Sequence, residues 1–275
     1  MNKAHQSLLH SPNQFGLRGV HALTLNTPAN FNALSSEMIA ALQTALDTIA
    51  ADSDARAVVI AANGAAFCAG HNLKDMAANP HEAYYQDLFA QCSKMMMGIT
   101  RLPVPVIARV HGMATAAGCQ LVAQCDLAVA SLAARFATSG IQYGLFCATP
   151  SVPLTRTIAA KHAMQMLVTG DFIDAATALQ FGLINAVSQE DNAESLDGSL
   201  EVLLRSICAK PRLALQMGKE LFYRQQTLGL DAAYQLAGQT MAANVMDASA
   251  QEGVRAFAEK RAPRWAPSVQ TASAT

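Results

Sequence analysis

The stretch RVHGMATAAGCQLVAQCD at 109–126 decides how the rest of the chain is organised. Together with the apolar residues just before it, it predicts a buried strand, a turn, and a helix that begins near Ala116. The turn is rich in glycine and alanine, which lets a ligand approach the backbone closely. A helix N-terminus also presents backbone N–H groups that have no partner inside the helix. The stretch therefore predicts a binding site for a negatively charged oxygen.

A second turn of the same kind lies upstream, in GAAFCAGHN at 64–72. It closes the apolar strand pattern AVVIAA and is again rich in small residues. Two turns that present N–H groups indicate an oxyanion hole, in which two donors hold a developing negative charge during acyl chemistry. An ordinary glycine-containing turn is the alternative interpretation of this segment.

Composition limits the class of protein. The chain has 275 residues, enough to bury a sizeable core as one large domain or two smaller ones. Apolar residues make up 52% and charged residues only 14%, so the charge-poor surface favours contacts between subunits. A net charge of −1 without a basic block argues against nucleic acid or an anionic membrane as a partner. No apolar run reaches the roughly 18 residues that a membrane span needs.

Targeting and cofactor signals are weak. The first residues, MNKAHQSLLHSPNQ, resemble neither a signal peptide nor a transit peptide, and they predict an irregular start and a cytoplasmic protein. Six cysteines without paired spacing indicate reduced thiols that are buried as small apolar side chains. The histidines lack metal-ligand spacing and no nucleotide-binding glycine motif occurs, so neither a metal nor a nicotinamide cofactor is predicted.

Strands and helices alternate over the first two thirds of the chain, and helical periodicity dominates the last third. The expected elements are strands at 17–26, 56–61 and 104–110 and helices at 36–51, 73–76, 81–101, within 149–182 and over 195–260. This order predicts an α/β core over 1–195 and a helical region over 196–275. Asp126 is expected to cap the central helix or to lie at a strand entry rather than act as a base.

Five segments resemble the enoyl-CoA hydratase/isomerase (crotonase) superfamily, in the same order along the chain. They are FCAGHNLKDM at 67–76, PVPVIARVHGMATAAGCQLVAQCDLAVAS at 103–131, RFATSGIQYGLF at 135–146, MLVTGDFIDAATALQFGLINAV at 166–187 and EGVRAFAEKRAPRW at 252–265. The TAAGCQLVAQCD and GLFCATP variants are similar to one branch in particular. The resemblance implies an α/β fold with a crotonase-like spiral of ββα units, and a C-terminal helical trimerisation region that forms a homotrimer or homohexamer.

The resemblance also assigns residues to the site. The family's first oxyanion donor is the N–H of the residue after the glycine of FCAGH, here His71. The second comes from the middle residue of a glycine triplet, here Ala117, which keeps its N–H. The imidazole of His71 is a separate candidate for acid chemistry, although this backbone position accepts many side chains. For coenzyme A the resemblance implies contacts from Lys74, Phe257 and Lys260, with solvated helix residues as the alternative.

The chain departs from the family at the acid–base residues. Hydratases of the family use two glutamates, and the corresponding positions here are Gln120 and Gly140; a third position, which carries aspartate in dienoyl-CoA isomerases, is Ala148. A glutamine can hydrogen-bond water but cannot take its proton at neutral pH. Because each general acid–base group contributes roughly 10²–10⁴ in rate, efficient hydration is not expected. Tyr143 and Cys147 are candidates for a weak acid, with packing as the alternative for both.

Three functions remain open at this point. The first is an enzyme of the enoyl-CoA hydratase/isomerase type, a lyase that acts on fatty acyl-CoA thioesters with weak or displaced acid–base chemistry. The second is an enzyme that stabilises a thioester enolate in another reaction, such as decarboxylation or thioester hydrolysis. The third is a non-catalytic acyl-CoA-binding regulator. In each, the expected partner is an acyl-CoA, and coenzyme A enters as part of the substrate rather than as a separate cofactor.

Overall fold

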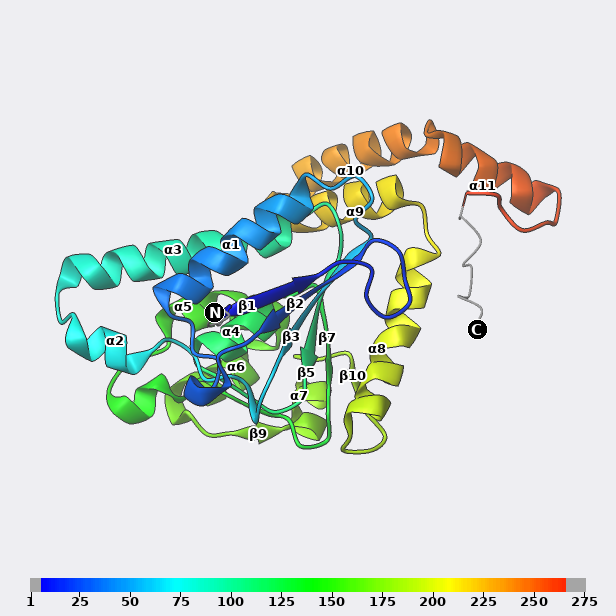
Figure 1. Ribbon diagram of the computed structural model, residues 1–275. Coiled ribbons are helices and arrows are strands. Elements are labelled where there is room, and N and C mark those ends of the chain that lie inside the picture. Colours follow the sequence, from blue (N-terminus) through cyan, green and yellow to red (C-terminus); the bar gives the residue numbers. More distant parts are fainter. Residues whose placement is uncertain (1–5, 266–275) are drawn as a thin grey trace.

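The computed structural model describes residues 6–265, and its strands form two sheets (Figure 1). The six-stranded sheet is parallel apart from its edge strand β1, and it has the order β1 (Leu8–Ser11), β2 (Val20–Leu25), β3 (Ala57–Ala62), β5 (Val106–Val110), β7 (Leu127–Ala130) and β10 (Ala186–Val187). The four-stranded sheet has the order β4 (Ala66–Cys68), β6 (Met113–Thr115), β8 (Arg135–Ala137) and β9 (Ile173–Asp174), with β9 antiparallel to β8.

From β3 to β8 successive strands alternate between the two sheets, and this alternation makes the fold a spiral. Strands β3, β5 and β7 lie in the larger sheet, while the strand that follows each of them lies in the smaller sheet. A helix follows each pair: α2 (Leu73–Ala78) and α3 (Glu82–Arg101) after β4, α4 (Ala117–Gln124) after β6, and α5 (Ala148–Thr157) after β8. The predicted α/β architecture of repeated ββα units is confirmed.

Capping residues set the ends of several other helices. The Ser35 hydroxyl accepts a hydrogen bond from the Met38 N–H at the start of α1, and the Asp174 carboxylate accepts one from the Thr177 N–H at the start of α7.

The remaining helices are α1 (Ser36–Ala50), α6 (Ala160–Thr169), α7 (Ala175–Phe181), α8 (Ala193–Cys208), α9 (Arg212–Gln225), α10 (Leu230–Val245) and α11 (Ala248–Ala258), with 3₁₀ turns η1 (Pro28–Asn30) and η2 (Ser139–Tyr143). Across residues 6–265, none of the helices could span a membrane.

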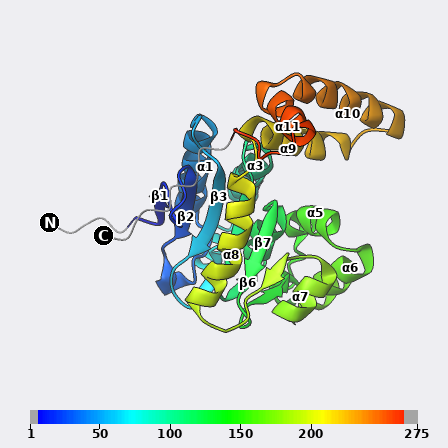
Figure 2. The same cartoon turned by 90° about the vertical axis from the view of Figure 1, so that its right-hand side faces the viewer.

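Two apolar layers cover the larger sheet. One face packs against α1, α3 and α4, with Leu23, Ile60 and Val106 among the buried residues. The other face packs against α8 through leucines at positions 196, 200 and 204, and Figure 2 shows this helix lying across the sheet. The domain boundary after residue 195 stays a prediction, but helix α8 runs across that position and packs against the sheet.

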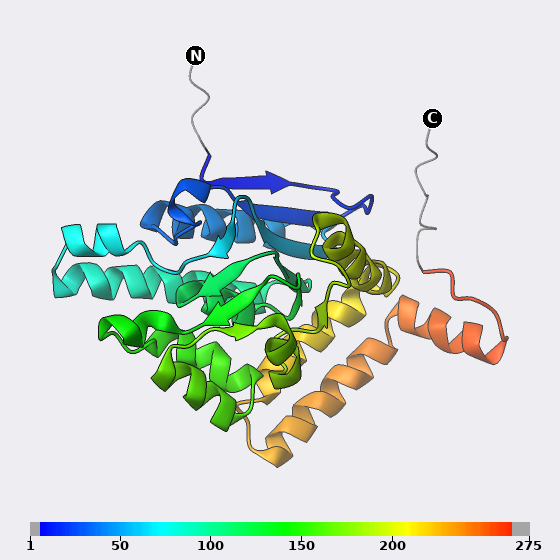
Figure 3. The same cartoon turned by 90° about the horizontal axis from the view of Figure 1, so that it is seen from below.

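Helices α9 to α11 form a tail that extends past the sheets (Figures 1 and 3). Neither α9 nor α10 contains a buried residue, and α11 contains one, Ala256. The tail instead exposes many large apolar side chains, namely Leu213, Phe222, Leu228, Leu230, Tyr234, Met241, Val245, Met246, Val254 and Phe257. An apolar surface of this kind is typical of a protein interface.

An ion pair with largely buried side chains, Lys219 and Asp126, connects the tail to the core. The Asp126 carboxylate accepts hydrogen bonds from Lys219 Nζ at 2.6 Å, the Tyr223 hydroxyl at 2.7 Å and the Val106 N–H at 2.7 Å. Lys219 Nζ also donates to two backbone carbonyls at 2.9 Å, so each of the three N–H groups of the ammonium has an acceptor. Asp126 therefore has a structural role at the entry of β5, as predicted, and it also anchors α9.

The irregular start predicted for the chain is wrong over Leu8–Ser11, which forms β1. This strand pairs antiparallel with β2, and His10 Nε2 lies 3.0 Å from His21 Nδ1 across the pair. Four residues are too few for an alternating pattern to stand out, so only the tertiary pairing reveals the strand. Residues 1–5 lie outside the described part of the chain.

Replacing Lys219 by methionine should destabilise the fold. The change leaves the Asp126 carboxylate buried without its counter-ion, and breaking a buried pair in this way costs about 3–5 kcal/mol. Thermal and urea unfolding followed by circular dichroism would measure the loss. The matched control is Arg224→Met on the same helix, because its ion pair with Glu220 is 60% exposed on both sides and should contribute at most about 1 kcal/mol. Equal stability of the two variants would contradict the anchor.

Candidate active site

The two predicted turns meet at one edge of the smaller sheet. Strands β4 and β6 are parallel neighbours, with Cys68 opposite Ala114. The chain leaves both strands in the same direction, so the FCAGHN turn and the N-terminus of α4 emerge side by side. A loop segment also supports the first turn, because the Leu34 N–H donates to the Gly70 carbonyl at 2.7 Å. The fold thus brings together two segments that are separated by about forty residues of sequence.

Two glycines make this contact possible. A Cβ at Gly118 would collide with the carbonyl oxygen of Cys68, so the first turn of α4 rests directly on the backbone of β4. Gly70 has a positive φ of +92°, and a Cβ there would lie 2.9 Å from the Ala116 Cβ and 3.1 Å from the Ala117 nitrogen. Both positions therefore need glycine because of close backbone approach.

The N–H groups of His71 and Ala117 are free donors at this contact. Within residues 6–265 neither group donates to a backbone carbonyl. Ala117 is the first residue of α4, where an N–H has no partner within the helix. The preceding Ala116 has φ 50° and ψ −118°, a strained conformation for alanine that fixes how the chain enters the helix. The two donors are thus held by rigid backbone before any ligand binds.

Gln120 lies one helical turn beyond these donors and is only 3% exposed. Its side chain leans toward the N-terminus of α4, as helical side chains do, and so lies over the turn. The buried Oε1 atom has no hydrogen-bond partner among the described residues. A buried amide oxygen without a partner is costly, so this atom is suited to accept a hydrogen bond from a ligand or water.

Gly140, which the resemblance matches to the second family glutamate, has no room for a side chain. Gly140 lies in η2, directly after β8, and a Cβ there would lie 2.5 Å from the Leu145 carbonyl oxygen and 2.8 Å from Cys147 Sγ. Ala148, at the third family position, is the exposed first residue of α5. The loop between η2 and α5 therefore occupies the space that a side chain at 140 would need.

Of the two candidate acids, the structure favours Cys147. Tyr143 is 74% exposed, which places its phenol in solvent rather than in an enclosed site. Cys147 is 6% exposed and lies against Gly140. Burial raises the pKa of the Cys147 thiol, and a hydrogen bond from the Gly140 backbone opposes this only in part. The sulfur is consequently a protonated thiol at neutral pH.

The His71 imidazole is neutral at pH 7. Its Nδ1 lies 3.4 Å from the Leu34 carbonyl oxygen, and its ring packs beside Phe89 with 5.4 Å between centroids. Burial lowers the pKa of the imidazole below its ordinary value. Its buried Nε2 has no hydrogen-bond partner among residues 6–265. The His71 side chain therefore adds no charge to the site.

One chain does not bring the predicted coenzyme A residues together. Lys74 is exposed in α2, Phe257 is 87% exposed in α11, and Lys260 follows α11. Helices α2 and α11 lie at opposite ends of the molecule (Figures 1 and 3). Any joint contact of these residues with one ligand therefore requires two copies of the chain, and their role stays a prediction.

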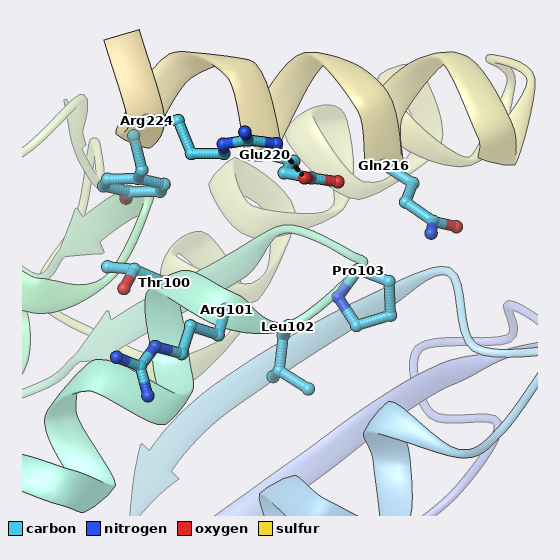
Figure 4. A pocket seen from close by; sticks show the side chains of 8 residues that line it. Thr100, Arg101, Leu102, Pro103, Gln216, Glu220 and Arg224 are labelled. Carbon is cyan, nitrogen blue, oxygen red and sulfur yellow. Dashed lines mark hydrogen bonds and ion pairs between the residues drawn. The ribbon is translucent and has the colours of Figure 1, made fainter. Parts of the chain in front are cut away.

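Two surface cavities lie beside the tail rather than at the turns. One, of about 420 Å³, lies between the end of α3 and α9 (Figure 4), and it is lined by Thr100, Arg101, Leu102, Pro103, Gln216, Glu220, Tyr223 and Arg224. The other, of about 430 Å³, lies beside α11 and Trp265. Neither includes His71 or Ala117. Within residues 6–265 no three His, Cys, Asp or Glu side chains gather as metal ligands.

The sequence predicted the two small-residue turns, but it did not reveal that the Leu145 carbonyl and Cys147 fill the space beside Gly140. This contact depends on the path of the loop that carries the Leu145 carbonyl and Cys147. No short sequence motif encodes it. The GLFC segment was the only available signal, since a cysteine directly after a loop of large apolar residues is expected to be buried.

Comparison with known proteins gives consistent matches. The enoyl-CoA hydratase/isomerase family model matches residues 17–268. Enoyl-CoA hydratase domain-containing protein 3, mitochondrial, from Xenopus laevis is 43% identical over 247 residues, which cover 90% of this chain and 83% of that protein. The crystal structure of an enoyl-CoA hydratase from Mycobacterium smegmatis has a TM-score of 0.90 and 56% identity, covering 94% of this chain and 98% of that one. The crystal structure of human enoyl-CoA hydratase domain-containing protein 3 has a TM-score of 0.87 and 40% identity, covering 94% of this chain and 100% of that one.

These matches confirm one prediction and correct another. The domain-containing protein 3 relatives are the branch to which the TAAGCQLVAQCD and GLFCATP variants point. The predicted cytoplasmic localisation is wrong by the same comparison, because the frog and human relatives are both named mitochondrial proteins. An N-terminal pattern alone was too weak a basis for that prediction. With a family model that matches nearly its whole length, the chain belongs to the enoyl-CoA hydratase/isomerase family.

Proposed function

We propose that the chain binds an acyl-CoA thioester and holds the thioester carbonyl oxygen between the N–H groups of His71 and Ala117. The observation that carries this proposal is the contact between the two turns, which sets two unpartnered backbone donors side by side. Both belong to rigid elements, so they need little reorganisation when charge develops on the oxygen. The membership of the family supports an acyl-CoA as the ligand.

An enzyme fits this site better than a pure binding protein. Removing one oxyanion donor from an enzyme costs roughly 10²–10³ in rate, so a preorganised pair is a catalytic feature. The proposed reaction is of the lyase type, on a fatty acyl-CoA, through a thioester enolate. Coenzyme A arrives with the substrate, and the proposal needs no separate cofactor or metal. A non-catalytic acyl-CoA-binding regulator is the second candidate, favoured by the closure around Gly140.

Efficient hydration of an enoyl-CoA is not part of the proposal. Hydration needs a group that takes a proton from water, and the Gln120 amide cannot do so at neutral pH. At Gly140 no side chain is present, and the space is occupied by the Leu145 carbonyl and the Cys147 sulfur. The proposed role of the site is therefore to stabilise a thioester enolate. Formation of that enolate must not depend on the two family glutamates, which Gln120 and Gly140 replace.

The proposed assembly is a homotrimer or homohexamer. The apolar side chains along α9, α10 and α11 support burial of the tail against another copy. The distance between α2 and α11 supports coenzyme A contacts that two subunits share, with Lys74 from one and Phe257 and Lys260 from the next.

Replacing Ala117 by leucine should abolish binding of acyl-CoA thioesters. Three added carbons at a buried turn fill the mouth of the oxyanion hole and displace the carbonyl oxygen from both donors. Isothermal calorimetry with butyryl-CoA should show a loss of at least about 100-fold in affinity, equivalent to roughly 2.7 kcal/mol. Ala40→Leu on the exposed face of α1 is the control and should bind normally. Binding by Ala117→Leu at wild-type strength would contradict the donor assignment.

Hydration of crotonyl-CoA should be at least about 10³-fold slower than in a relative with both glutamates, because two acid–base groups are absent. Gln120→Glu should fold and raise the rate, because the glutamate is of similar size to the amide that it replaces. Gly140→Glu should destabilise the protein instead, since its Cβ would overlap with Leu145 and Cys147. Gly198→Glu, at a position on α8 with open space around it, is the matched control for stability. Wild-type turnover equal to that of the relative would refute the prediction.

Multi-angle light scattering should give a mass of three or six chains. Replacing Met241 and Met246, two exposed methionines of the tail, by glutamate should shift the protein toward smaller species, because charges would be buried at the interface. The corresponding change of the exposed Met164, on α6, to glutamate tests whether the effect is confined to the tail. A monomeric wild-type protein at micromolar concentration would contradict the proposed assembly.

A further inference from the structure

The pair Asn63–Gly64 is the only place in the sequence where a glycine follows an asparagine. It lies in the loop between β3 and β4, and both residues are exposed. An asparagine amide is thermolabile, because the next peptide nitrogen can attack it and close a five-membered ring. Glycine favours this closure, since it has no side chain to hinder the nitrogen. The loop therefore contains the residue pair of this chain that is most prone to lose its amide as ammonia.

The fold requires a glycine at position 64. Gly64 has a φ of +88°, in the left-handed region that favours glycine, and a Cβ there would lie 2.5 Å from the Pro28 Cβ. A larger residue would therefore strain the backbone and overlap with the proline. The chain cannot protect the asparagine by placing a side chain at position 64.

The backbone nitrogen of Gly64 is available as the nucleophile. Within residues 6–265 its N–H donates to no acceptor. The carbonyl of the same peptide group, which belongs to Asn63, accepts a hydrogen bond from Asn32 Nδ2 at 2.8 Å. When the N–H loses its proton, negative charge spreads onto this oxygen, and a hydrogen bond to the charged form favours it. Asn32 is fully buried and thus favours the reactive form of the nitrogen.

The side-chain amide that would be attacked is held from the solvent side. Asn63 Nδ2 donates to Asn26 Oδ1 at 3.0 Å, and this contact is exposed. Water can replace an exposed hydrogen bond, so breaking it costs little. Rotation of the amide toward the Gly64 nitrogen is therefore accessible in the folded protein.

We propose that Asn63 is a site of spontaneous deamidation in the folded protein, and that isoaspartate forms there. The site lies outside the two turns that carry His71 and Ala117. Its reaction depends on neither acyl-CoA binding nor the oxyanion hole.

Water is the only co-reactant that the step needs. A solvent base takes the proton of the Gly64 N–H, and the nitrogen attacks Cγ of Asn63. The bond between Cγ and Nδ2 breaks, and the leaving group takes a proton and departs as ammonia, which leaves a succinimide ring. Water then opens the ring at one of its two carbonyls to give aspartate or isoaspartate. No group is oxidised or reduced.

Isoaspartate at position 63 would disturb the loop. Its backbone runs through the former side chain, so the path from β3 into β4 becomes longer by one carbon. The former main-chain carbonyl becomes a free carboxylate beside the buried amide of Asn32, which also donates to the Ala66 carbonyl at 2.9 Å. A negative charge in partly buried surroundings without an opposite charge is costly. We therefore expect the modified protein to be less stable.

The test incubates the folded, full-length protein and follows residue 63 by peptide mapping with mass spectrometry. Isoaspartate is counted by the methyl groups that a protein isoaspartyl methyltransferase transfers to it. It should accumulate at position 63, and faster at alkaline pH, because the attack requires loss of the Gly64 proton. The pair Asp197–Gly198 is the internal control and should stay unmodified, because helix α8 holds its backbone.

Two variants locate the reaction. Asn63→Gln keeps an amide but would have to close a larger ring, and it should form no product at position 63 over the same time. Asn26→Ala frees the Asn63 amide and should speed the reaction about 2- to 10-fold, the factor that corresponds to one hydrogen bond. Asn79→Ala removes a comparable exposed hydrogen bond at the end of α2 and should leave the rate unchanged.

A sample unfolded in urea gives the decisive comparison. Absence of isoaspartate at position 63 in the folded protein would overturn the inference, and its presence in the unfolded chain over the same time would show that the fold protects the site. Modified protein, separated by ion exchange, should unfold at a temperature lower by at least about 2 °C, a shift typical of a modest loss of stability in a large domain. An unchanged unfolding temperature would contradict the expected effect on the loop.

Discussion

The direct contact between the backbone of β4 and the first turn of α4 is the constraint on which the site depends. Gly118 lies against the Cys68 carbonyl, and Gly70 lies against the Ala117 nitrogen, so neither position has room for a side chain. The pairing of β4 with β6 sets the two chain segments at this spacing. Larger residues at these positions would force the two turns apart. The small residues of both motifs follow from this geometry.

The site uses fixed dipoles rather than charges. Its candidate donors are backbone N–H groups, its candidate acceptor is the Gln120 amide oxygen, and the His71 imidazole is neutral at pH 7. In a buried environment dipoles of this kind act strongly on a developing oxyanion, since little water competes with them. The charged pair of Asp126 and Lys219 serves a different purpose, because it anchors the tail.

Local patterns in the sequence predicted the features that depend on neighbouring residues. The strand before the central turn and the helix start near Ala116 both follow from residues within a few positions of each other. The features that were missed depend on distant contacts. Lys219 reaches Asp126 across 93 positions, and β1 is defined by its pairing with β2. Periodicity carries no information about such contacts, and the closure around Gly140 depends in the same way on how a loop folds back.

The closure around Gly140 also limits how this chain can change over generations. With the Leu145 carbonyl and the Cys147 sulfur in the space beside position 140, a carboxylate cannot be regained there by one substitution. The loop between η2 and α5 would first have to move away from position 140. A carboxylate at position 140 is unfavourable while the loop stays in place. The loop between η2 and α5 therefore opposes any side chain at position 140.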